Sequence, residues 1–333
     1  MAITLKDVAE RAGVSRSAVS RTFTEGASVS ARTRAIVEKA ASELGYRPNM
    51  LARSLTTRRT ALIGLVADNF RNPIFLEIFD LFTKGLQERG LRPLLVNLSG
   101  QTDPAESLSL LQAYSVDGVV VASSTLPPTF AGAFADAGVP IIHAFGRATG
   151  DPRRPVVGID NRAAGQLAAE TLLARGYRRI GYLGGPEQAS STQDRLAGFR
   201  DALTQDRLTD VRFAAAYSFA AGRREMIEAL QASPADAYFC GDDVLSVGAV
   251  SAIHDRGLTV PGDIGILGFN DMEIAGWNNI ELTTIRQPIP EIVAAAIDRM
   301  VSILSEDGAG APADQLFPCD VIERGTLRRA GQI

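Results

Sequence analysis

Two residue types that carry much of enzyme chemistry are scarce in this 333-residue chain, which has two cysteines, Cys240 and Cys319, and two histidines, His143 and His254. The cysteines lie far apart without a CxxC pattern, so neither a disulfide framework nor a zinc site is predicted. HExxH, GxSxG and P-loop motifs are missing, and neither GYLGGPEQ nor GILGFNDM has the GxGxxG spacing of a dinucleotide-binding turn. We therefore expect a protein that is not an enzyme and that binds no metal ion and no cofactor.

Long apolar runs are also missing. No stretch is long enough to span a bilayer, and the first ten residues, MAITLKDVAE, carry charges where a secretory signal would be apolar. The composition, 46% hydrophobic and 22% charged, is that of an ordinary globular protein, and the length suffices for two or three domains. We expect a cytoplasmic protein with no membrane partner.

The formal net charge of −4 conceals a basic N-terminal segment. Of the 34 basic and 38 acidic residues, 11 basic and 5 acidic residues fall within residues 1–60, which gives this segment a net charge of +6 and the remainder −10. Nucleic-acid affinity follows local rather than total charge. A solvated basic surface is the alternative explanation of the same imbalance, so the motifs in this segment decide its meaning.

The N-terminal segment predicts two short helices that meet at a glycine turn. Thr4 followed by Asp7 resembles a capping box, and the helix that it starts ends before Gly13. The apolar face of this helix consists of Leu5, Val8, Ala9 and Ala12. Ser15 is expected to cap a second helix that continues to about Phe23. In that helix we expect Val19 and Phe23 to point inward, and the outward-facing residues are Arg16, Ser17, Ser20 and Arg21.

A third helix is predicted to begin at Ser30 and to end at Gly45. Its apolar stripe is expected to consist of Ile36, Val37, Ala40 and Leu44. The three helices together predict a helix-turn-helix unit, whose second helix lies in the DNA major groove. A helical hairpin of this length also occurs in protein-interaction modules, so the context must decide between the two interpretations.

If the unit binds DNA, its second helix supplies the residues that distinguish bases. The candidate base-reading residues are Arg16, Ser17 and Arg21. Arginine suits this role because its forked donors can bind guanine O6 and N7 together. The residues expected to contact the DNA backbone are Thr4, Ser15, Ser20, Thr24 and Asn49.

Residues 4–55 contain a series of short strings, which in order are LKDVAERAGVS, SAVSR, VSARTR, LGYRPN and ARSL. With these strings the segment resembles the lactose-repressor (LacI/GalR) family of transcriptional regulators. The resemblance implies that the stretch after YRPN forms a hinge helix when two subunits sit on an operator, and that a leucine from each enters the minor groove. Here that leucine is Leu55, with Ala52 and Arg53 beside it.

Apolar wedges in the minor groove unstack a base step at a cost that additional contacts offset, which agrees with the role that the resemblance gives to Leu55. The alternative is an ordinary apolar residue in an interdomain linker. We accordingly expect a helix-turn-helix domain at residues 1–47, a hinge helix and linker at 48–59, and an effector-binding and dimerisation domain at 60–333.

Beyond residue 60, short apolar runs alternate with helical stretches, a pattern typical of parallel sheets with crossover helices. About 270 residues exceed a single comfortable core, which favours two sheets. The resemblance implies a body like that of periplasmic sugar-binding proteins, with two lobes joined by three crossing strands near Val157–Asp160, Thr284–Gln287 and Phe317–Asp320. The N-lobe then comprises about 60–158 and 288–317, and the C-lobe about 161–284 and 320–333.

In open α/β sheets, ligands bind beyond the carboxyl ends of the strands, so polar and aromatic residues after each apolar run are candidates for an effector site. Combined with the resemblance, this rule selects Asn72, Phe75, Arg147, Arg195, Tyr217, Phe219, Asp242 and Asn270. Each has a structural alternative, because loop arginines often form ordinary salt bridges and aspartates after strands often cap the next helix. The family frequently has an acid at the position of Asn270, and this departure weakens the assignment of a sugar.

The sequence therefore predicts a sequence-specific transcriptional regulator, acting as a repressor, that binds a pseudo-palindromic operator in double-stranded DNA as a homodimer. A small-molecule effector, a sugar or sugar derivative, is expected to control it, although Arg147 and Arg195 would also suit an acidic or phosphorylated ligand. The chain has no heptad extension, which favours a dimer over a tetramer. The alternative function is a sugar receptor of a transport system that does not bind DNA.

Overall fold

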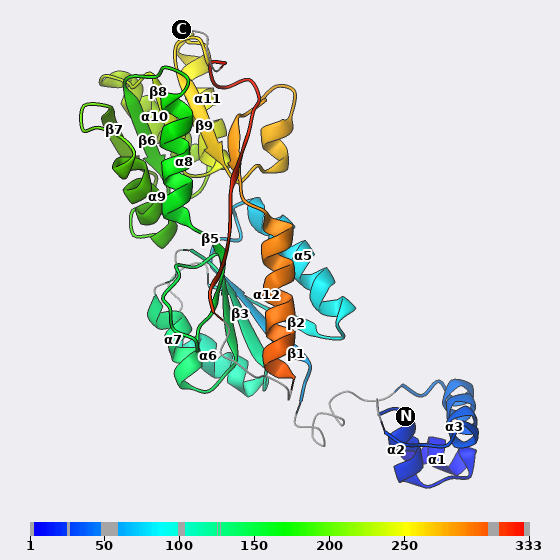
Figure 1. Cartoon of the computed structure of the whole chain (residues 1–333). Coiled ribbons are helices and arrows are strands. Elements are labelled where there is room, and N and C mark those ends of the chain that lie inside the picture. The colour runs from blue at the N-terminus through cyan, green and yellow to red at the C-terminus, as the bar shows by residue number, and fades with distance from the viewer. Residues whose placement is uncertain are drawn as a thin grey trace. The chain divides into compact units, whose positions relative to one another are not determined.

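The computed structural model describes residues 3–24, 27–47, 59–98, 104–124, 126, 128–305 and 313–329. Its contacts divide the chain into two units, residues 1–60 and residues 61–333, each of which is described by itself (Figure 1). Four predicted DNA-contact residues lie outside the described residues: Asn49, Ala52, Arg53 and Leu55. None of the helices within these ranges has both the length and the apolar character needed to cross a membrane.

The N-terminal unit contains the three predicted helices. They are α1 (Leu5–Ala12), α2 (Arg16–Thr22) and α3 (Ala31–Leu44). Each begins at the expected cap: the Thr4 hydroxyl and the Asp7 carboxylate form a reciprocal capping box, while the hydroxyls of Ser15 and Ser30 accept from backbone N–H groups three residues on. Gly13 and Gly45 end α1 and α3 with φ of 65° and 67°, a backbone that glycine adopts without strain.

One small core holds these helices together. Val8, Val19 and Val37, one from each helix, have no exposed surface. The expectation that Ile36 points inward is wrong, because its side chain is 41% exposed and Ala41 is buried instead. Helix α3 packs against both α1 and α2, and Val37 and Ala41 lie on its buried face. Successive residues on a helix are rotated by about 100°, so Ile36 lies off this face.

The second unit is the predicted two-lobed α/β body, with two six-stranded sheets in its described part (Figure 1). The first sheet has the order β11-β5-β4-β3-β1-β2, and all its strands are parallel. Its strands are β1 (Leu62–Ala67), β2 (Arg92–Asn97), β3 (Gly118–Ala122), β4 (Ile141–Ala144), β5 (Val156–Ile159) and β11 (Gln315–Phe317). The helices of this lobe are α5 (Ile74–Glu88), α6 (Pro104–Ala113), α7 (Pro128–Asp136) and α12 (Ile289–Leu304).

The second sheet has the order β12-β10-β9-β8-β6-β7 and is parallel except for the pair β10 and β12. Its strands are β6 (Ile180–Gly184), β7 (Leu208–Phe213), β8 (Ala237–Cys240), β9 (Gly265–Phe269), β10 (Thr284–Arg286) and β12 (Asp320–Ile322). The helices of this lobe are α8 (Asn161–Leu173), α9 (Ser190–Asp201), α10 (Phe219–Gln231), α11 (Asp243–Asp255) and the 3₁₀ helix η1 (Glu273–Gly276).

The chain passes between the two sheets three times. It leaves the first sheet after β5, returns to it after β10 through α12, and leaves again between β11 and β12. Helix α12 follows a strand of the second lobe but packs on α5 and on β3, β4 and β5 of the first, as Figure 1 shows. Three short connections between two lobes are the arrangement of a hinge.

Candidate functional site

The N-terminal unit presents the outer face of α2 to solvent. Arg16, Ser17, Ser20 and Arg21 are all exposed, whereas Val19 and Thr22 on the opposite face are buried. The side chains of Arg16 and Arg21 have no hydrogen bond or ion pair with another of the described residues, so both guanidinium groups are available to a partner. A short helix with two unpaired arginines on its exposed face has the chemistry required to read guanine edges in a major groove.

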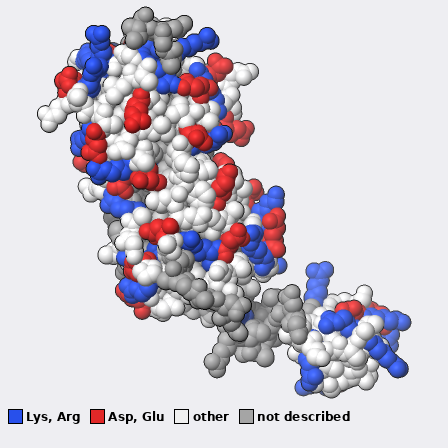
Figure 2. All heavy atoms as spheres, in the orientation of Figure 1, with Lys and Arg blue, Asp and Glu red and all other residues white. Residues whose placement is uncertain are grey.

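The hydroxyl groups predicted to contact the DNA backbone lie around the ends of α1 and α2. Thr4 caps α1, the Ser15 hydroxyl caps α2 and also hydrogen-bonds to that of Ser17, and the Thr24 hydroxyl donates to the carbonyl of Ser20. Helix N-termini favour phosphate because their first N–H groups are unpaired. In Figure 2 the charged residues on the visible face of this unit are mostly Lys and Arg, in agreement with the charge asymmetry of the sequence.

In the second unit, a cleft between the two lobes holds about 600 Å³ of space, including open solvent at its mouth. Its lining comes mainly from residues that directly follow strands, because parallel strands in both sheets end at this edge. The described residues of the lining are Asp68, Asn69, Asn72, Ile74, Phe75, Ile78, Ala122, Ser123, Ser124, Phe145, Ile159, Asn161, Ser191, Arg195, Tyr217, Asp242, Asn270 and Gln287.

Arg195 on α9 is the one arginine of this lining, and it is held rigidly. Its side chain is buried, its Nε donates to the Asn161 amide oxygen at 2.8 Å, and one terminal nitrogen donates to the Gly241 carbonyl at 2.7 Å. The guanidinium also lies 3.6 Å from the centre of the Phe269 ring. Its other terminal nitrogen has no partner among the described residues, so a fixed donor is left for a ligand.

Asp242 is the centre of a hydrogen-bond network that joins the two lobes. Its carboxylate accepts from the side-chain amides of Asn72, at 2.7 Å, and Asn270, at 3.0 Å, while Gln287 donates to the amide oxygen of Asn270 at 2.6 Å. Asn72 belongs to the first lobe and Asp242 caps α11 of the second. Burial raises the pKa of Asp242 to about 6, although the hydrogen bonds from Asn72 and from the backbone of Val244 oppose this rise.

Aromatic side chains complete the cleft on both lobes. Phe75 and Phe145 line it from the first lobe, and Phe75 packs on Phe79 with ring centres 5.7 Å apart. Tyr217 lines it from the second lobe, where its hydroxyl is hydrogen-bonded to the hydroxyls of Thr192, at 3.0 Å, and Ser191, at 3.3 Å. The cleft therefore combines flat apolar faces with fixed polar groups, as small-molecule sites commonly do.

Two predicted effector residues do not line the cleft. The Nε and one terminal nitrogen of Arg147 donate to the carboxylate of Asp194, at 2.8 and 2.7 Å. This arginine therefore forms an ion pair, and neither partner lines the cleft. Phe219 is 43% exposed at the start of α10, because the face of that helix at Ala221 and Gly222 is the one that packs inward. The remaining predicted residues, which the structure brings together in the cleft, are Asn72, Phe75, Arg195, Tyr217, Asp242 and Asn270.

Several lining residues were not among the predictions: Asp68, Asn69, Ser123, Ser124, Phe145, Asn161, Ser191 and Gln287. Most of them lie within two residues of the carboxyl end of a strand, which is where ligands bind in open α/β sheets. Ser191 lies four residues before Arg195 in α9, so the two side chains share one face of the helix. The sequence therefore contained a signal for these residues.

A helix-turn-helix unit with an exposed basic reading helix, joined to a two-lobed domain with a polar interlobe cleft, defines the class of ligand-responsive DNA-binding regulators. Residues 4–49 match the family described as bacterial regulatory proteins, lacI family, and residues 169–327 match the periplasmic binding protein-like domain. The chain is 32% identical over 332 residues to the HTH-type transcriptional repressor PurR of Proteus mirabilis (strain HI4320), covering 97% of this chain and 96% of that protein.

The HTH-type transcriptional repressor CytR of Escherichia coli (strain K12) is 31% identical, over 98% of this chain and 97% of that protein. Among solved structures, a Lac repressor dimer bound to operator and the anti-inducer ONPF matches with a TM-score of 0.86 and 27% identity, covering 98% of this chain and 99% of that one. A complex of the transcriptional regulator CelR with cellobiose matches with a TM-score of 0.72 and 26% identity, covering 97% and 99%.

The chain thus belongs to the lacI family of bacterial regulatory proteins, and it is a DNA-binding transcriptional repressor. Because these full-length relatives are repressors, they also confirm that the chain is not an enzyme, and the alternative of a transport receptor that does not bind DNA is set aside.

Proposed function

We propose that this repressor binds a pseudo-palindromic operator as a homodimer, and that a neutral, polyhydroxylated small molecule in the interlobe cleft, a sugar or a sugar derivative, controls its operator affinity. The observation that supports this best is the convergence of polar groups from both lobes on one cleft. A ligand that touches both lobes has a different affinity for each lobe angle, which is what coupling between two sites requires.

The charges of the cleft favour a neutral ligand. The acidic and basic side chains of its described lining are those of Asp68, Asp242 and Arg195, because Arg147 is paired with Asp194 elsewhere. An acidic or phosphorylated ligand would meet two carboxylates and one arginine that already has two bonds. Ligand hydroxyls can instead donate to Asp242 and accept from the unbonded nitrogen of Arg195.

A dimer is supported by an exposed apolar surface on the first lobe. Leu76 on α5 is 72% exposed and Leu95 on the edge strand β2 is 48% exposed, and α5 packs on β2. Large exposed leucines on neighbouring elements can mark a protein interface. The similar Lac repressor structure is titled a dimer on its operator, and a second head doubles the contacts that give tight specific binding.

The effector proposal is tested by the melting temperature of the purified protein against neutral sugars, nucleosides, sugar acids and sugar phosphates. A native-state ligand at 100 times its Kd stabilises the protein by about 2.7 kcal/mol, a shift that is easily measured. We expect a shift with a neutral polyhydroxylated compound. Shifts only with sugar acids or sugar phosphates would contradict the charge argument.

The operator proposal is tested by selecting bound fragments from random double-stranded DNA. We expect two inverted half-sites. By the family resemblance, Leu55 wedges into the minor groove between them, so Leu55→Ala should weaken binding of the selected fragment much more than binding of an unrelated one. Equal losses on both fragments would argue against the wedge, and a single unpaired half-site would argue against the dimer.

A further inference from the structure

Helix α9 has no cap of its own. Its N-cap residue, Ala189, has no side chain that can accept from the first-turn N–H groups. Instead, the carbonyl of Ser124, at the end of β3 in the other lobe, accepts from the Ser190 backbone N–H at 3.0 Å and from the Ser190 hydroxyl at 2.9 Å. The hydroxyls of Ser191 and Ser124 also hydrogen-bond, at 3.0 Å. The first lobe therefore caps a helix of the second, and this cap is lost if the lobes separate.

Arg147 makes a second connection from the first lobe to the same helix. Besides its two bonds to Asp194, its guanidinium donates to the Ser190 carbonyl at 3.2 Å and to the Gln193 side chain at 3.3 Å. The Arg147 and Asp194 side chains are 40% and 29% exposed, so this bidentate pair is partly shielded from solvent. Neither residue lines the effector cleft, although Asp194 immediately precedes Arg195, which does.

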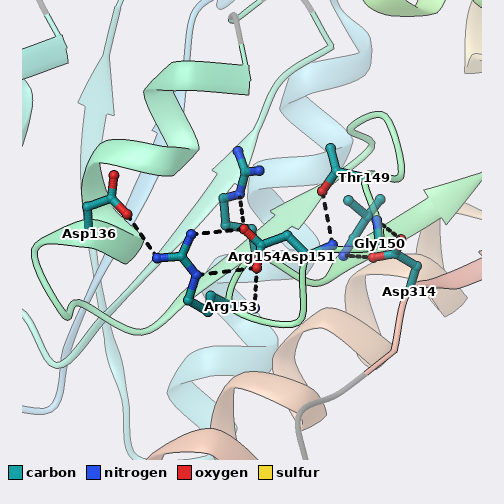
Figure 3. A network of polar contacts seen from close by, with 8 residues as sticks. Asp136, Thr149, Gly150, Asp151, Arg153, Arg154 and Asp314 are labelled. Atoms are coloured by element: carbon teal, nitrogen blue, oxygen red, sulfur yellow. Dashed lines mark hydrogen bonds and ion pairs between the residues drawn. The ribbon is translucent and has the colours of Figure 1, made fainter.

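The loop that carries Arg147 is braced against the first lobe. A Cβ on Gly146 would lie 2.4 Å from the His143 ring, so the loop packs tightly on β4 there. Further along, the Asp314 carboxylate accepts from the backbone N–H groups of Gly150 and Val156. As Figure 3 shows, Asp151 lies between Arg153 and Arg154, and Arg153 also reaches Asp136. Arg147 is thus anchored to one lobe while its partner belongs to the other.

Helix α9 moves as one body with α8. A Cβ on Gly165 of α8 would lie 2.0 Å from the Arg195 carbonyl oxygen, and one on Gly198 of α9 would lie 1.8 Å from that of Arg162. The two backbones therefore touch, and neither helix can slide without the other. Helix α8 begins at Asn161, directly after the crossing from β5. A displacement of α9 would therefore also displace the start of α8 at the hinge.

We propose that Arg147 and Asp194, together with the cap that Ser124 supplies to α9, form an interlobe latch that sets the lobe angle in the absence of effector. The latch goes beyond the proposed effector site, because its ion pair between Arg147 and Asp194 lies outside the cleft and needs no ligand, while Ser124 also lines the cleft. An effector that changes the lobe angle must work with or against this latch, so the ion pair adjusts the response of the repressor without itself contacting effector or DNA.

The latch is tested on the full-length protein by hydrogen–deuterium exchange of the peptide that contains the start of α9. Opening of the latch exposes the Ser190 N–H, so the exchange rate reports the open population. Loss of a partly shielded bidentate pair in Arg147→Met should raise this rate about fivefold. Asp194→Asn should do the same, and the double variant should exchange no faster than either single variant.

Arg153→Met is the matched control, because this arginine lies in the same loop and pairs with two aspartates inside the first lobe only. We expect exchange at α9 to stay at the wild-type rate in this variant. An unchanged rate in Arg147→Met, an equal increase in Arg153→Met, or independent effects of Arg147→Met and Asp194→Asn would each overturn the latch.

The regulatory role is tested by the affinity of the same variants for the selected operator fragment without effector. Arg147→Met and Asp194→Asn should change the operator Kd about fivefold in the same direction, and Arg153→Met should not. This second readout rests on the proposed coupling between cleft and operator, whereas the exchange measurement does not, so the two failures are distinguishable. Faster exchange with unchanged operator affinity would overturn the latch as a regulatory device.

Discussion

The two units use arginine in opposite ways. Arg16 and Arg21 stand on the exposed face of α2 with no partner among the described residues, whereas Arg195 is buried, bonded to Asn161 and Gly241, and stacked on Phe269. An exposed arginine keeps its hydration and mobility until DNA arrives, which suits long-range attraction and sliding on the backbone. A buried arginine has lost both, and it offers its last donor in one fixed direction.

This difference explains why one residue type can serve recognition of a polymer and of a small molecule in the same chain. Operator binding spreads its free energy over many contacts, of which each arginine supplies a modest part. The proposed effector site offers few contacts, and its polar groups are mostly buried, so the loss of one is expected to be severe. Substitutions of these arginines should therefore change either effector affinity or operator affinity, but not both.

The largest effect is expected from Arg195→Met. The variant removes the fixed donor and leaves the Asn161 oxygen and the Gly241 carbonyl without it, so the effector Kd should rise about 100-fold or more. Operator affinity without effector should stay near that of the wild type. Calorimetry with the compound found by thermal shift measures the first, with exposed Arg200→Met on the same helix as the control. A normal effector affinity in Arg195→Met would remove this residue from the site.

A smaller effect is expected from Arg16→Ala and Arg21→Ala. Each loses a base contact worth about 1–3 kcal/mol, so affinity for the selected operator should fall about 5- to 160-fold, while non-specific DNA binding falls much less. Fluorescence anisotropy with both kinds of fragment measures the ratio. The exposed Arg32 on α3 provides a charge-matched control, Arg32→Ala, which should lower both affinities alike. The same uniform loss in Arg16→Ala and Arg21→Ala would mean that they contact only the backbone.

The smallest effect is expected from pH. Because burial raises the pKa of Asp242 to about 6, its carboxylate becomes protonated below that pH, and the acceptor site that its bonds to Asn72, Asn270 and Val244 leave for a ligand is weakened. Effector affinity should therefore be about tenfold lower at pH 5 than at pH 7. Operator binding should vary less, since residues 1–60 contain no histidine. Calorimetry at the two pH values checks this, and equal affinities would contradict a role of the Asp242 carboxylate.

The same pKa has a consequence for stability. The folded-state pKa of Asp242 lies above the ordinary value of 3.8, so the native state binds more protons than the unfolded state between these two pH values. The contribution of Asp242 to the free energy of unfolding is thus most favourable below 3.8 and is lost as the pH rises through about 6. Asp242→Asn should remove this dependence, which thermal unfolding at pH 4 to 7 can detect.

Sequence reasoning succeeded where the determinants are local. Thr4, Ser15 and Ser30 start helices because their side chains accept from nearby N–H groups, and Gly13 and Gly45 end them because glycine tolerates a positive φ. The alternation of apolar runs with helical stretches likewise fixes the two sheets, because strand spacing and crossovers follow from chain-local patterns.

Sequence reasoning failed where a residue's environment is set by a distant segment. Arg147 follows a strand end as the cleft residues do, but it pairs with Asp194, 47 positions away and in the other lobe. Phe219 lies on α10, whose buried face is the one that packs on α11. Ile36 lies on α3, whose buried face is the one that packs on α1 and α2. No periodicity within one segment contains that information.

The central claim, that the cleft governs the head, is tested most directly by the affinity of the full-length protein for its selected operator with and without the compound found by thermal shift. We predict that a saturating amount of this compound changes the operator Kd of the wild type by about tenfold or more and leaves that of Arg195→Met unchanged. Identical operator affinity of the wild type with and without the compound would contradict the account, as would an Arg195→Met protein that responds like the wild type.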